Sequence, residues 1–257
     1  MERLANARIV MWEGGGLWIV EATPAATRQT QRTDAHAHHA IQVTISLGGR
    51  FRLDTPQGHV GGDAVAVAAD ASHLFEAEGL VALLFVEPES RLGRAVAREI
   101  FDGAALARVA EARIGDFRAR AAAAYAAPVR DGAALEALGR DLVHRLAGAA
   151  RADPPDLRVR RMIAWAAEHI EGPVSLADAA AVSALSPGRL RHLFVRETGL
   201  AFKTYLLWLR LVRAVERVAA GASLTEAAHD AGFADSAHFS RTFRRMFGVT
   251  PAALRMT

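Results

Sequence analysis

The chain has 257 residues, 51% of them hydrophobic and none of them cysteine, which is the composition of a folded protein of about two domains and excludes disulfide and thiolate chemistry. The formal net charge of +3 is uneven: residues 157–257 carry 14 Lys and Arg against 8 Asp and Glu, and residues 1–156 carry 17 against 20. A basic module beside an acidic one is typical of nucleic-acid binding by one part of a chain, although ordinary surface charge is the alternative.

Several function classes lack their sequence motifs. No apolar run of 18 residues and no opening signal-peptide pattern occur, so we expect a cytoplasmic protein without a membrane span. The sequence has no G-x-S-x-G motif, no P-loop and no G-x-G-x-x-G motif after a strand. We therefore expect no enzymatic activity and no cofactor.

The first ninety residues predict short strands. Residues 1–13 give no clear pattern. Apolar and β-branched segments bounded by Gly, Pro, Asp and Ser then predict strands over residues 17–22, 40–47, 50–54, 58–60, 64–68 and 80–87. Several short strands at close spacing indicate a sandwich or a barrel.

A histidine cluster, HAHH at residues 36–39, precedes the second of these strands. Side chains two residues apart share a face of an extended segment, and His73 can approach that face from a later strand. The polar set is His36, His38, Gln42, Thr44, Ser46 and His73. It can line a metal-free pocket for a hydrogen-bonding ligand, which we expect, or hold a divalent metal through His36, His38, Gln42 and His73. Ordinary core or surface histidines are the third alternative.

The period becomes helical after Pro88. Helices are predicted over residues 91–100, 104–126 with a possible break at Gly115, and 132–149. They can form a lid on the core of the sheet, or one of them can form a dimer seam. The polar Pro-Pro segment 151–156 is typical of a linker between a first domain over residues 1–150 and a second over residues 157–257.

The second domain opens with a helix predicted over residues 157–170. A capping box at Ser175 then starts a helix over residues 176–182. After a short turn, Ser186 followed by proline starts a further helix to about residue 197, which Gly199 ends. The pair predicts a helix-turn-helix whose second helix can enter a DNA major groove.

A second unit has the same arrangement of caps and breaks, and its second helix starts at Asp235, 49 residues after Ser186. A capping box at Ser223 starts a short helix, Gly232 breaks it, and Asp235 caps a helix over residues 236–247 that ends at Gly248. Phe239, Phe243 and Phe247 form its buried stripe. A helical spacer over residues 201–220, about 30 Å long at 1.5 Å per residue, joins the two units. That length is close to the ~34 Å pitch between major-groove faces on one side of DNA.

Residues 157–255 resemble the DNA-binding domain of AraC/XylS-type transcriptional regulators. The matching segments are SLADAAAVSALSPGRLRHLFVRETGLAFKTYLLWLRLVRA and AGFADSAHFSRTFRRMFGVTPAALR. The resemblance implies base reading by the two second helices, through Arg189, Arg191, His192, Ser236, His238 and Arg241. The small residues Gly188 and Ala237 occupy positions where the family often has larger ones. Arg191 and Arg241 are suited to bidentate contact with guanine. We expect phosphate contacts from Arg196, Lys203, Arg244 and Arg245.

The histidine segment (residues 34–46, around the HAHH cluster) contains a pattern similar to a cupin motif, in which Gln42 stands at the usual acidic position. AraC/XylS-type regulators commonly carry a cupin-like sensing domain there. The expected fold is therefore α+β: an N-terminal cupin-like β-barrel with a helical hairpin, and a C-terminal all-α domain with two helix-turn-helix motifs joined by a long helix.

We accordingly predict a transcriptional regulator, with activators among the family members it resembles. Its expected partners are double-stranded DNA and a small-molecule effector, with a second copy of the chain left open as a further partner. One alternative is a metal-binding cupin, either a metal sensor or an enzyme, fused to a DNA-binding module. A further alternative is a DNA-binding protein whose barrel serves only dimerisation.

Overall fold

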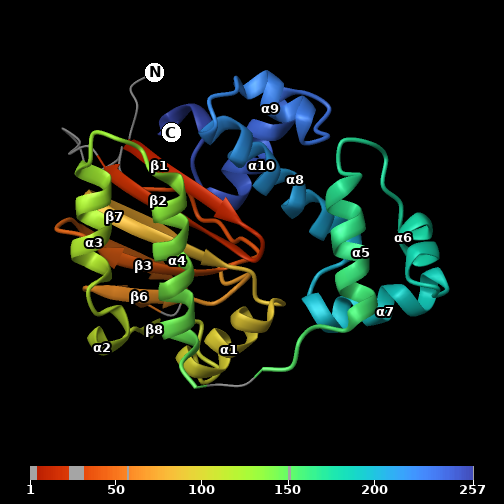
Figure 1. The fold of residues 1–257 in the computed structure, drawn as a ribbon, viewed down its shortest axis with the longest axis horizontal. Helices are drawn as coiled ribbons and strands as arrows, with labels where there is room; N and C mark the ends of the chain where they lie inside the picture. Colours follow the sequence, from red (N-terminus) through yellow and green to blue (C-terminus); the bar gives the residue numbers. More distant parts are fainter. Residues whose placement is uncertain (1–4, 23–31, 57, 150–151, 257) are drawn as a thin grey trace.

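The computed structural model of the chain describes residues 5–22, 32–56, 58–149 and 152–256 (Figure 1). Its first part is a sheet with helices on one face, and its last part is helical, so the predicted α+β class is confirmed. Among these residues no helix combines the length and the apolar character needed to cross a bilayer.

The strands agree with the predicted ones except for three unpredicted strands and the start of β7. In chain order they are β1 (Ala5–Trp12), β2 (Gly15–Ala22), β3 (Ile41–Ser46), β4 (Arg50–Thr55), β5 (Gly58–Gly61), β6 (Ala64–Val67), β7 (Leu74–Val86), β8 (Leu106–Arg108) and β9 (Leu254–Met256). β1, β8 and β9 were not predicted as strands. β7 starts six residues before the predicted residue 80, because residues 74–78 pair with β4 and the strand continues through Gly79.

The long strand β7 joins two sheets. Its first half pairs with β4, which pairs with β5, and its second half lies between β2 and β3. The main sheet has the order β8-β6-β3-β7-β2-β1-β9. Its edge strands β8 and β9 are not joined in the described residues, so the barrel-like structure is open there.

Four helices cover the outer face of the main sheet (Figure 1). They are α1 (Arg91–Ile100), α2 (Glu111–Ile114), α3 (Phe117–Ala126) and α4 (Gly132–Ala147). The predicted break at Gly115 is confirmed, and its φ is +55°. Residues 104–110 were wrongly predicted as helical: β8 lies there, because backbone pairing with β6 satisfies its polar groups at the sheet edge. Val43 and Ile45 pack under these helices with almost no exposed surface.

The C-terminal helices agree closely with the predicted ranges. They are α5 (Leu157–Glu168), α6 (Leu176–Val182), α7 (Pro187–Thr198), α8 (Phe202–Ala219), α9 (Leu224–Asp230) and α10 (Ser236–Phe247). The helix α8 runs from the α5–α7 group to the α9–α10 group (Figure 1). At 18 residues it is about 27 Å long.

The inner face of the sheet packs against the C-terminal helices. Trp18 and Phe85 from the sheet share one apolar cluster with Trp208 of α8 and Phe243 of α10. The rings of Trp18 and Phe243 are stacked with centroids 6.4 Å apart. Beyond α10, β9 pairs in parallel with β1, so the end of the chain extends the sheet formed by its beginning. The α9–α10 unit therefore shares its core with the sheet.

Candidate functional site

Both helix-turn-helix units have the capping geometry that the sequence predicts. Ser175 and Ser223 each form a complete capping box at the start of α6 and α9. The Ser186 and Asp235 side chains cap α7 and α10. Gly199 ends α7 with φ +80°, and the corresponding Gly248 ends α10 with φ +70°. These local signals fix where each second helix begins and ends.

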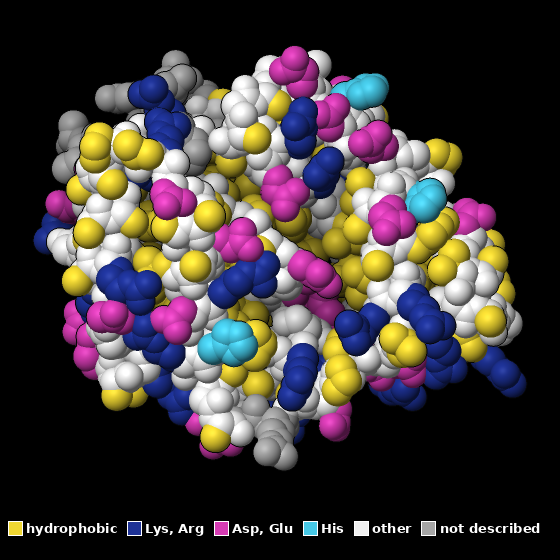
Figure 2. All heavy atoms as spheres, in the orientation of Figure 1, with side chains coloured by type: hydrophobic (Ala, Val, Ile, Leu, Met, Phe, Trp, Pro, Cys, Tyr) yellow, Lys and Arg dark blue, Asp and Glu magenta, His cyan; other side chains and the backbone are white. Residues whose placement is uncertain are grey.

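The side chains predicted to read bases differ in exposure between the two units. Arg189, Arg191 and His192 are exposed on α7, while Leu190 and Phe194 are buried beneath them. On α10, Arg241 is exposed, but Ser236 and His238 are half-buried. The His238 ring packs edge-on against Phe233, with centroids 5.2 Å apart. Arg241 therefore has the most exposed side chain of these three residues on α10. Lys and Arg side chains gather over α5 and α7 (Figure 2).

A groove of about 1300 Å³ is lined by residues of both helix-turn-helix units. Its wall includes Arg191 of α7, Lys203 of α8, and His238 and Arg245 of α10. Residues from the first part of the chain, His36 among them, form another side of it. Arg191 and the α10 pair thus face one shared space, although they are far apart in sequence.

Carboxylates engage two of the four arginine and lysine side chains predicted to contact phosphate. The Nη2 atom of Arg196 donates to Oε1 of Glu197 at 3.1 Å, and Nη2 of Arg244 lies 2.7 Å from Oδ2 of Asp34. Lys203 and Arg245 remain on the groove wall. Neither Glu197 nor Asp34 was singled out from the sequence: Glu197 is adjacent to Arg196, whereas Asp34 lies 210 residues from Arg244, a pairing that local spacing does not reveal.

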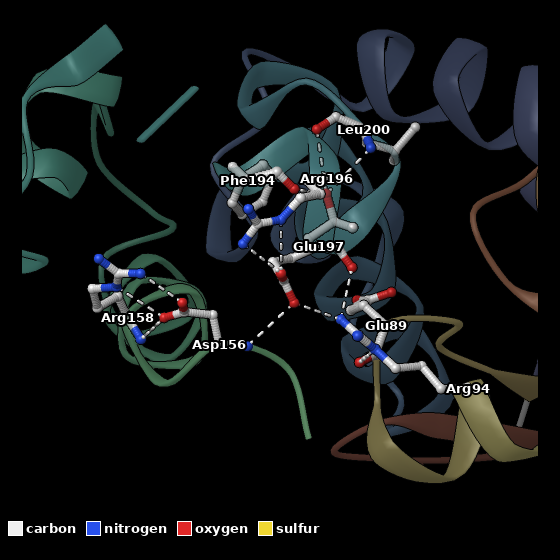
Figure 3. Close-up of polar contacts among 9 residues, drawn as sticks. Glu89, Arg94, Asp156, Arg158, Phe194, Arg196, Glu197 and Leu200 are labelled. Carbon is white, nitrogen blue, oxygen red and sulfur yellow. Dashed lines mark hydrogen bonds and ion pairs between the residues drawn. The ribbon is translucent and has the colours of Figure 1, made fainter. Parts of the chain in front are cut away.

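Glu197, at the C-terminal end of α7, attaches the first unit to the sheet domain. Its Oε2 atom accepts from Nη2 of Arg94 at 2.8 Å and from the backbone N–H of Asp156 at 3.3 Å (Figure 3). Arg94 also donates to the backbone carbonyl of Glu197 at 3.1 Å. Burial alone would raise the pKa of the Glu197 carboxyl, but these donors outweigh burial and the pKa is lowered.

A second polar link joins α8 to the histidine segment. The Tyr205 hydroxyl donates to Oε1 of Glu89 at 2.5 Å, and Nε2 of His39 lies 3.0 Å from Oε2 of the same carboxylate. Burial alone would lower the pKa of His39, but its bonds to Asp70 and Glu89 raise the pKa to about 9. His39 lies off the face shared by His36 and His38, so its position in HAHH gave no indication of this role.

The polar set of the histidine segment is largely buried. His36, His38, Gln42, Thr44 and His73 are each at most 6% exposed. Gln42 bonds to His38 on one side and donates to Oγ1 of Thr44 on the other. Ser46 stands apart at the end of β3 and donates to the carbonyl of Gly49. The groove reaches only His36 of this set, so the effector pocket predicted from all six residues stays a prediction.

The histidine segment touches the end of α10. The backbone N–H of Asp34 donates to the carbonyl of Gly248 at 2.8 Å. The His38 ring lies 5.9 Å from that of Phe247. A Cβ atom on Gly248 would lie 2.7 Å from Nδ1 of His36. The second helix-turn-helix unit and the histidine segment are thus in direct contact.

Comparisons with known proteins match these features. A model of a helix-turn-helix domain family matches residues 176–257. The HTH-type transcriptional activator RhaS of Escherichia fergusonii is 41% identical over 101 residues, which are 39% of this chain and 36% of RhaS. The alignment therefore spans about a third of the length of that curated relative. A crystallised transcriptional regulator from Chromobacterium violaceum, titled as having an AraC-type DNA-binding domain, is 30% identical over 37% of this chain and 86% of its own, with a TM-score of 0.36.

One similarity covers nearly the whole fold. ToxT from Vibrio cholerae O395 superposes with a TM-score of 0.57 over 96% of this chain and 95% of its own, at 12% identity. At that identity the likeness concerns the fold alone. It covers the sheet domain and the C-terminal helices together.

Proposed function

We propose that the chain is a transcription factor of the AraC/XylS type that binds double-stranded DNA in a sequence-specific way; the helix-turn-helix model over residues 176–257 and the 41% identity to RhaS over 101 residues support this. The observation that carries the proposal is the shared groove: Arg191 of one unit and Arg245 of the other line the same space, with α8 between them. The helix α8 that joins the two units is about 27 Å long, a length comparable to the ~34 Å pitch of duplex DNA. RhaS, a relative of the C-terminal helices, is an activator, and we extend this role to the present chain.

We assign the base contacts to side chains in the first half of each second helix. These are Arg189, Arg191 and His192 on α7, and Ser236, His238 and Arg241 on α10. An arginine in the major groove can donate two hydrogen bonds to O6 and N7 of guanine, so Arg191 and Arg241 carry most of the specificity. The remaining positions contribute less, since Ser236 and His238 are half-buried.

Phosphate contacts are assigned to Arg196, Lys203, Arg244 and Arg245. The duplex must replace the carboxylates that now pair with Arg196 and Arg244. Because these carboxylates are fixed in part by the sheet domain, the state of that domain affects DNA affinity.

We propose residues 1–150 as a sensing domain, residues 151–156 as a linker and residues 157–257 as the DNA-binding domain. The sensing domain receives a small-molecule signal at the histidine segment, and a homodimer forms through one of its helices. A structure of ToxT at 12% identity is titled as unsaturated fatty acid bound, which supports a ligand-binding role for this fold. We place the protein in the cytoplasm and assign it no catalytic activity, in keeping with relatives that are transcriptional regulators.

The test is selection of preferred sequences from random duplexes by the purified full-length chain, followed by affinity measurements on the selected site. We expect Arg191→Ala and Arg241→Ala each to cost about 1–3 kcal/mol and to relax preference at one base pair. We expect Arg245→Ala to weaken all sequences alike and to reduce the salt dependence. Arg140→Ala, on α4 of the sheet domain, serves as the control. If Arg241→Ala leaves the selected sequence unchanged, the base-reading assignment is wrong.

A further inference from the structure

The turns of the two helix-turn-helix units have the same backbone hydrogen bonds. In each turn two successive N–H groups donate to carbonyls three and five residues back along the chain, at distances of 2.9 to 3.2 Å. The pairs are Ala184 to Ala181 and Leu185 to Ala180 in the first turn, and Gly232 to His229 and Phe233 to Ala228 in the second. The left-handed residue is Ala184 (φ +52°) in the first turn and Gly232 (φ +73°) in the second. These two residues therefore occupy equivalent positions.

The glycine of the second turn is required by a neighbour. Alanine adopts the left-handed conformation in the first turn, so this backbone does not by itself demand glycine. A Cβ atom on Gly232, however, would lie 2.2 Å from the carbonyl oxygen of Ile170 and 3.1 Å from Nε of Arg210. Ile170 follows the end of α5, a helix that packs in the core of the first unit. The second turn therefore lies directly against the end of α5, and glycine permits this close approach.

Arg210 of α8 spans the same contact. Its Nη2 atom donates to the carbonyl of Gly172 at 3.1 Å, and its Nε atom donates to the carbonyl of Ile170 at 3.4 Å. These carbonyls lie just beyond the C-terminal end of α5, where backbone oxygens lack helical partners and the helix dipole favours a cation. Ile170, Gly172, Arg210 and Gly232 thus form a junction between the two units.

The two halves of α8 belong to different cores. Tyr205 and Leu206 pack in the core of the first unit. Leu211 and Val215 pack in the cluster that the second unit shares with the sheet. Arg210 lies close to the change from one core to the other. Because a long helix can curve, the angle between the two units depends on contacts across the junction as well as on α8.

A hollow of about 350 Å³ borders the junction. Its wall includes Glu171 from the end of α5, Arg210 of α8, and Phe233 and His238 of the second unit. His238 is one of the side chains to which base contacts are assigned above. The hollow leaves the units room to turn relative to each other once the bridge formed by Arg210 is removed.

We propose that this junction sets the angle between α7 and α10, and thereby the spacing of the two half-sites that the chain accepts on DNA, with Arg210 as the positioning residue. The inference rests on the proposed function, since half-sites exist only if both helices read bases. One base pair inserted between two half-sites turns one of them by about 35° and moves it by about 3.4 Å relative to the other. A firmly held pair of units cannot follow this change, whereas a loosened pair can.

The first test measures the angle in the absence of DNA. The chain has no cysteine, so cysteines introduced at the exposed positions Val195 of α7 and Thr225 of α9 carry spin labels at two defined sites. We expect a narrow distribution of label-to-label distances in the full-length chain and a broadened one with Arg210→Ala. Arg213→Ala is the matched control and should keep the narrow distribution, because Arg213 is exposed and pairs with Glu216 of its own helix. Equal widths for Arg210→Ala and the unsubstituted chain would overturn the proposal.

The second test uses duplexes that carry the selected half-sites at the selected spacing, or with one base pair added. We expect the added base pair to weaken wild-type binding about tenfold or more. Arg210→Ala should reduce this loss to about threefold or less, while each half-site keeps its preferred bases. Arg213→Ala should keep the wild-type loss. An Arg210→Ala variant that changes the preferred bases and keeps the spacing loss would show that Arg210 reads DNA directly and that the junction does not set the spacing.

A second variant keeps the proposal testable if Arg210→Ala fails to fold. Gly232→Ala places a methyl group against the carbonyl of Ile170 and should shift both the mean label distance and the preferred spacing. Gly199→Ala should shift neither, because φ there is a similar +80° but a Cβ has no neighbour within 4 Å. An unshifted label distance in folded Gly232→Ala would contradict the junction. A chain with the expected distances that distinguishes no DNA sequences would instead refute the proposed function, so the two failures are separable.

Discussion

The two helix-turn-helix units share a capping box on the first helix and a left-handed glycine at the end of the second, yet they are held in different ways. The first unit packs around a core of its own, which includes Met162, Leu190 and Phe194. The second unit has no separate core of this kind among the described residues, since Phe239 and Phe243 belong to the cluster that also contains Trp18 and Phe85 of the sheet. Similar local sequence thus produces one nearly independent unit and one that is part of the sheet domain.

This difference indicates how a change at the histidine segment can affect each helix-turn-helix unit. Apolar packing and the contact with Gly248 couple the second unit directly to the histidine segment. The first unit is reached through α8 and through polar contacts at Glu89 and Glu197. We therefore expect a ligand at the histidine segment to act first on α10 and to reach α7 through α8 and through the polar contacts at Glu89 and Glu197.

The largest effect should come from the two buried phenylalanines. Phe243→Ala and Phe194→Ala each remove a fully buried ring and should destabilise the chain by about 3–5 kcal/mol. We expect Phe243→Ala to speed hydrogen exchange in β2 as well as in α10, because Trp18 loses its stacking partner. Phe194→Ala should speed exchange in α5–α7 and leave β2 protected. Equal effects of both variants on β2 would show that the two units are attached alike.

The second-largest effect is expected at Gly248, which ends α10, and it is measured against Gly199, which ends α7. Gly248→Ala should cost about 1–2 kcal/mol for the left-handed backbone and roughly 1–3 kcal/mol more for overpacking. The added Cβ meets the Asp34 carbonyl at 2.5 Å and His36 at 2.7 Å. Gly199→Ala is the matched control, because a Cβ there has no neighbour within 4 Å and only the backbone term remains. Chemical denaturation measures both, and a cost for Gly199→Ala equal to that for Gly248→Ala would contradict the contact.

The sequence predicted the parts of this structure that depend on local chemistry. The starts of α6, α7, α9 and α10 follow from Ser175, Ser186, Ser223 and Asp235, because a cap acts within three residues of itself. The ends of α7, α9 and α10 follow from Gly199, Gly232 and Gly248, which adopt positive φ, whereas α6 ends without a glycine. The same reasoning explains why the limits of the two helix-turn-helix units were predicted to within about a residue.

The remaining features depend on partners far along the chain. β8 and β9 are three-residue strands that form because β6 and β1 offer free edges for pairing. The sequences of β8 and β9 alone do not indicate that these partners exist. The His36, His38 and Gln42 face was predictable from strand parity, whereas the pairing of Glu197 with Arg94 spans 103 residues. The contact between α10 and the histidine segment could likewise not be predicted from the spacing of residues in the sequence.

A moderate effect is expected at the polar attachment of the first unit. Glu197→Gln removes a charge that Arg94 and Arg196 contact, and should cost about 1–2 kcal/mol at neutral pH. The pKa of Glu197 is lowered in the folded chain, so its stabilising contribution is present above the ordinary carboxyl pKa and is lost as pH falls through the lowered value. Unfolding curves of wild type and variant should therefore converge under acidic conditions. A gap that stays constant with pH would mean that the charge of Glu197 has no part in the attachment.

The smallest effect concerns the ion pair between Asp34 and Arg244. Both side chains are more than half exposed, so Asp34→Asn should change stability by less than about 1 kcal/mol. It should nevertheless strengthen DNA binding and steepen the salt dependence by about one ion, because Arg244 becomes free to contact phosphate. Glu136→Gln, which breaks an exposed pair with Arg140 on α4, should leave both quantities unchanged. In an Arg244→Ala background the gain from Asp34→Asn should disappear; if it persists, the carboxylate acts by general repulsion of DNA and does not compete for this arginine.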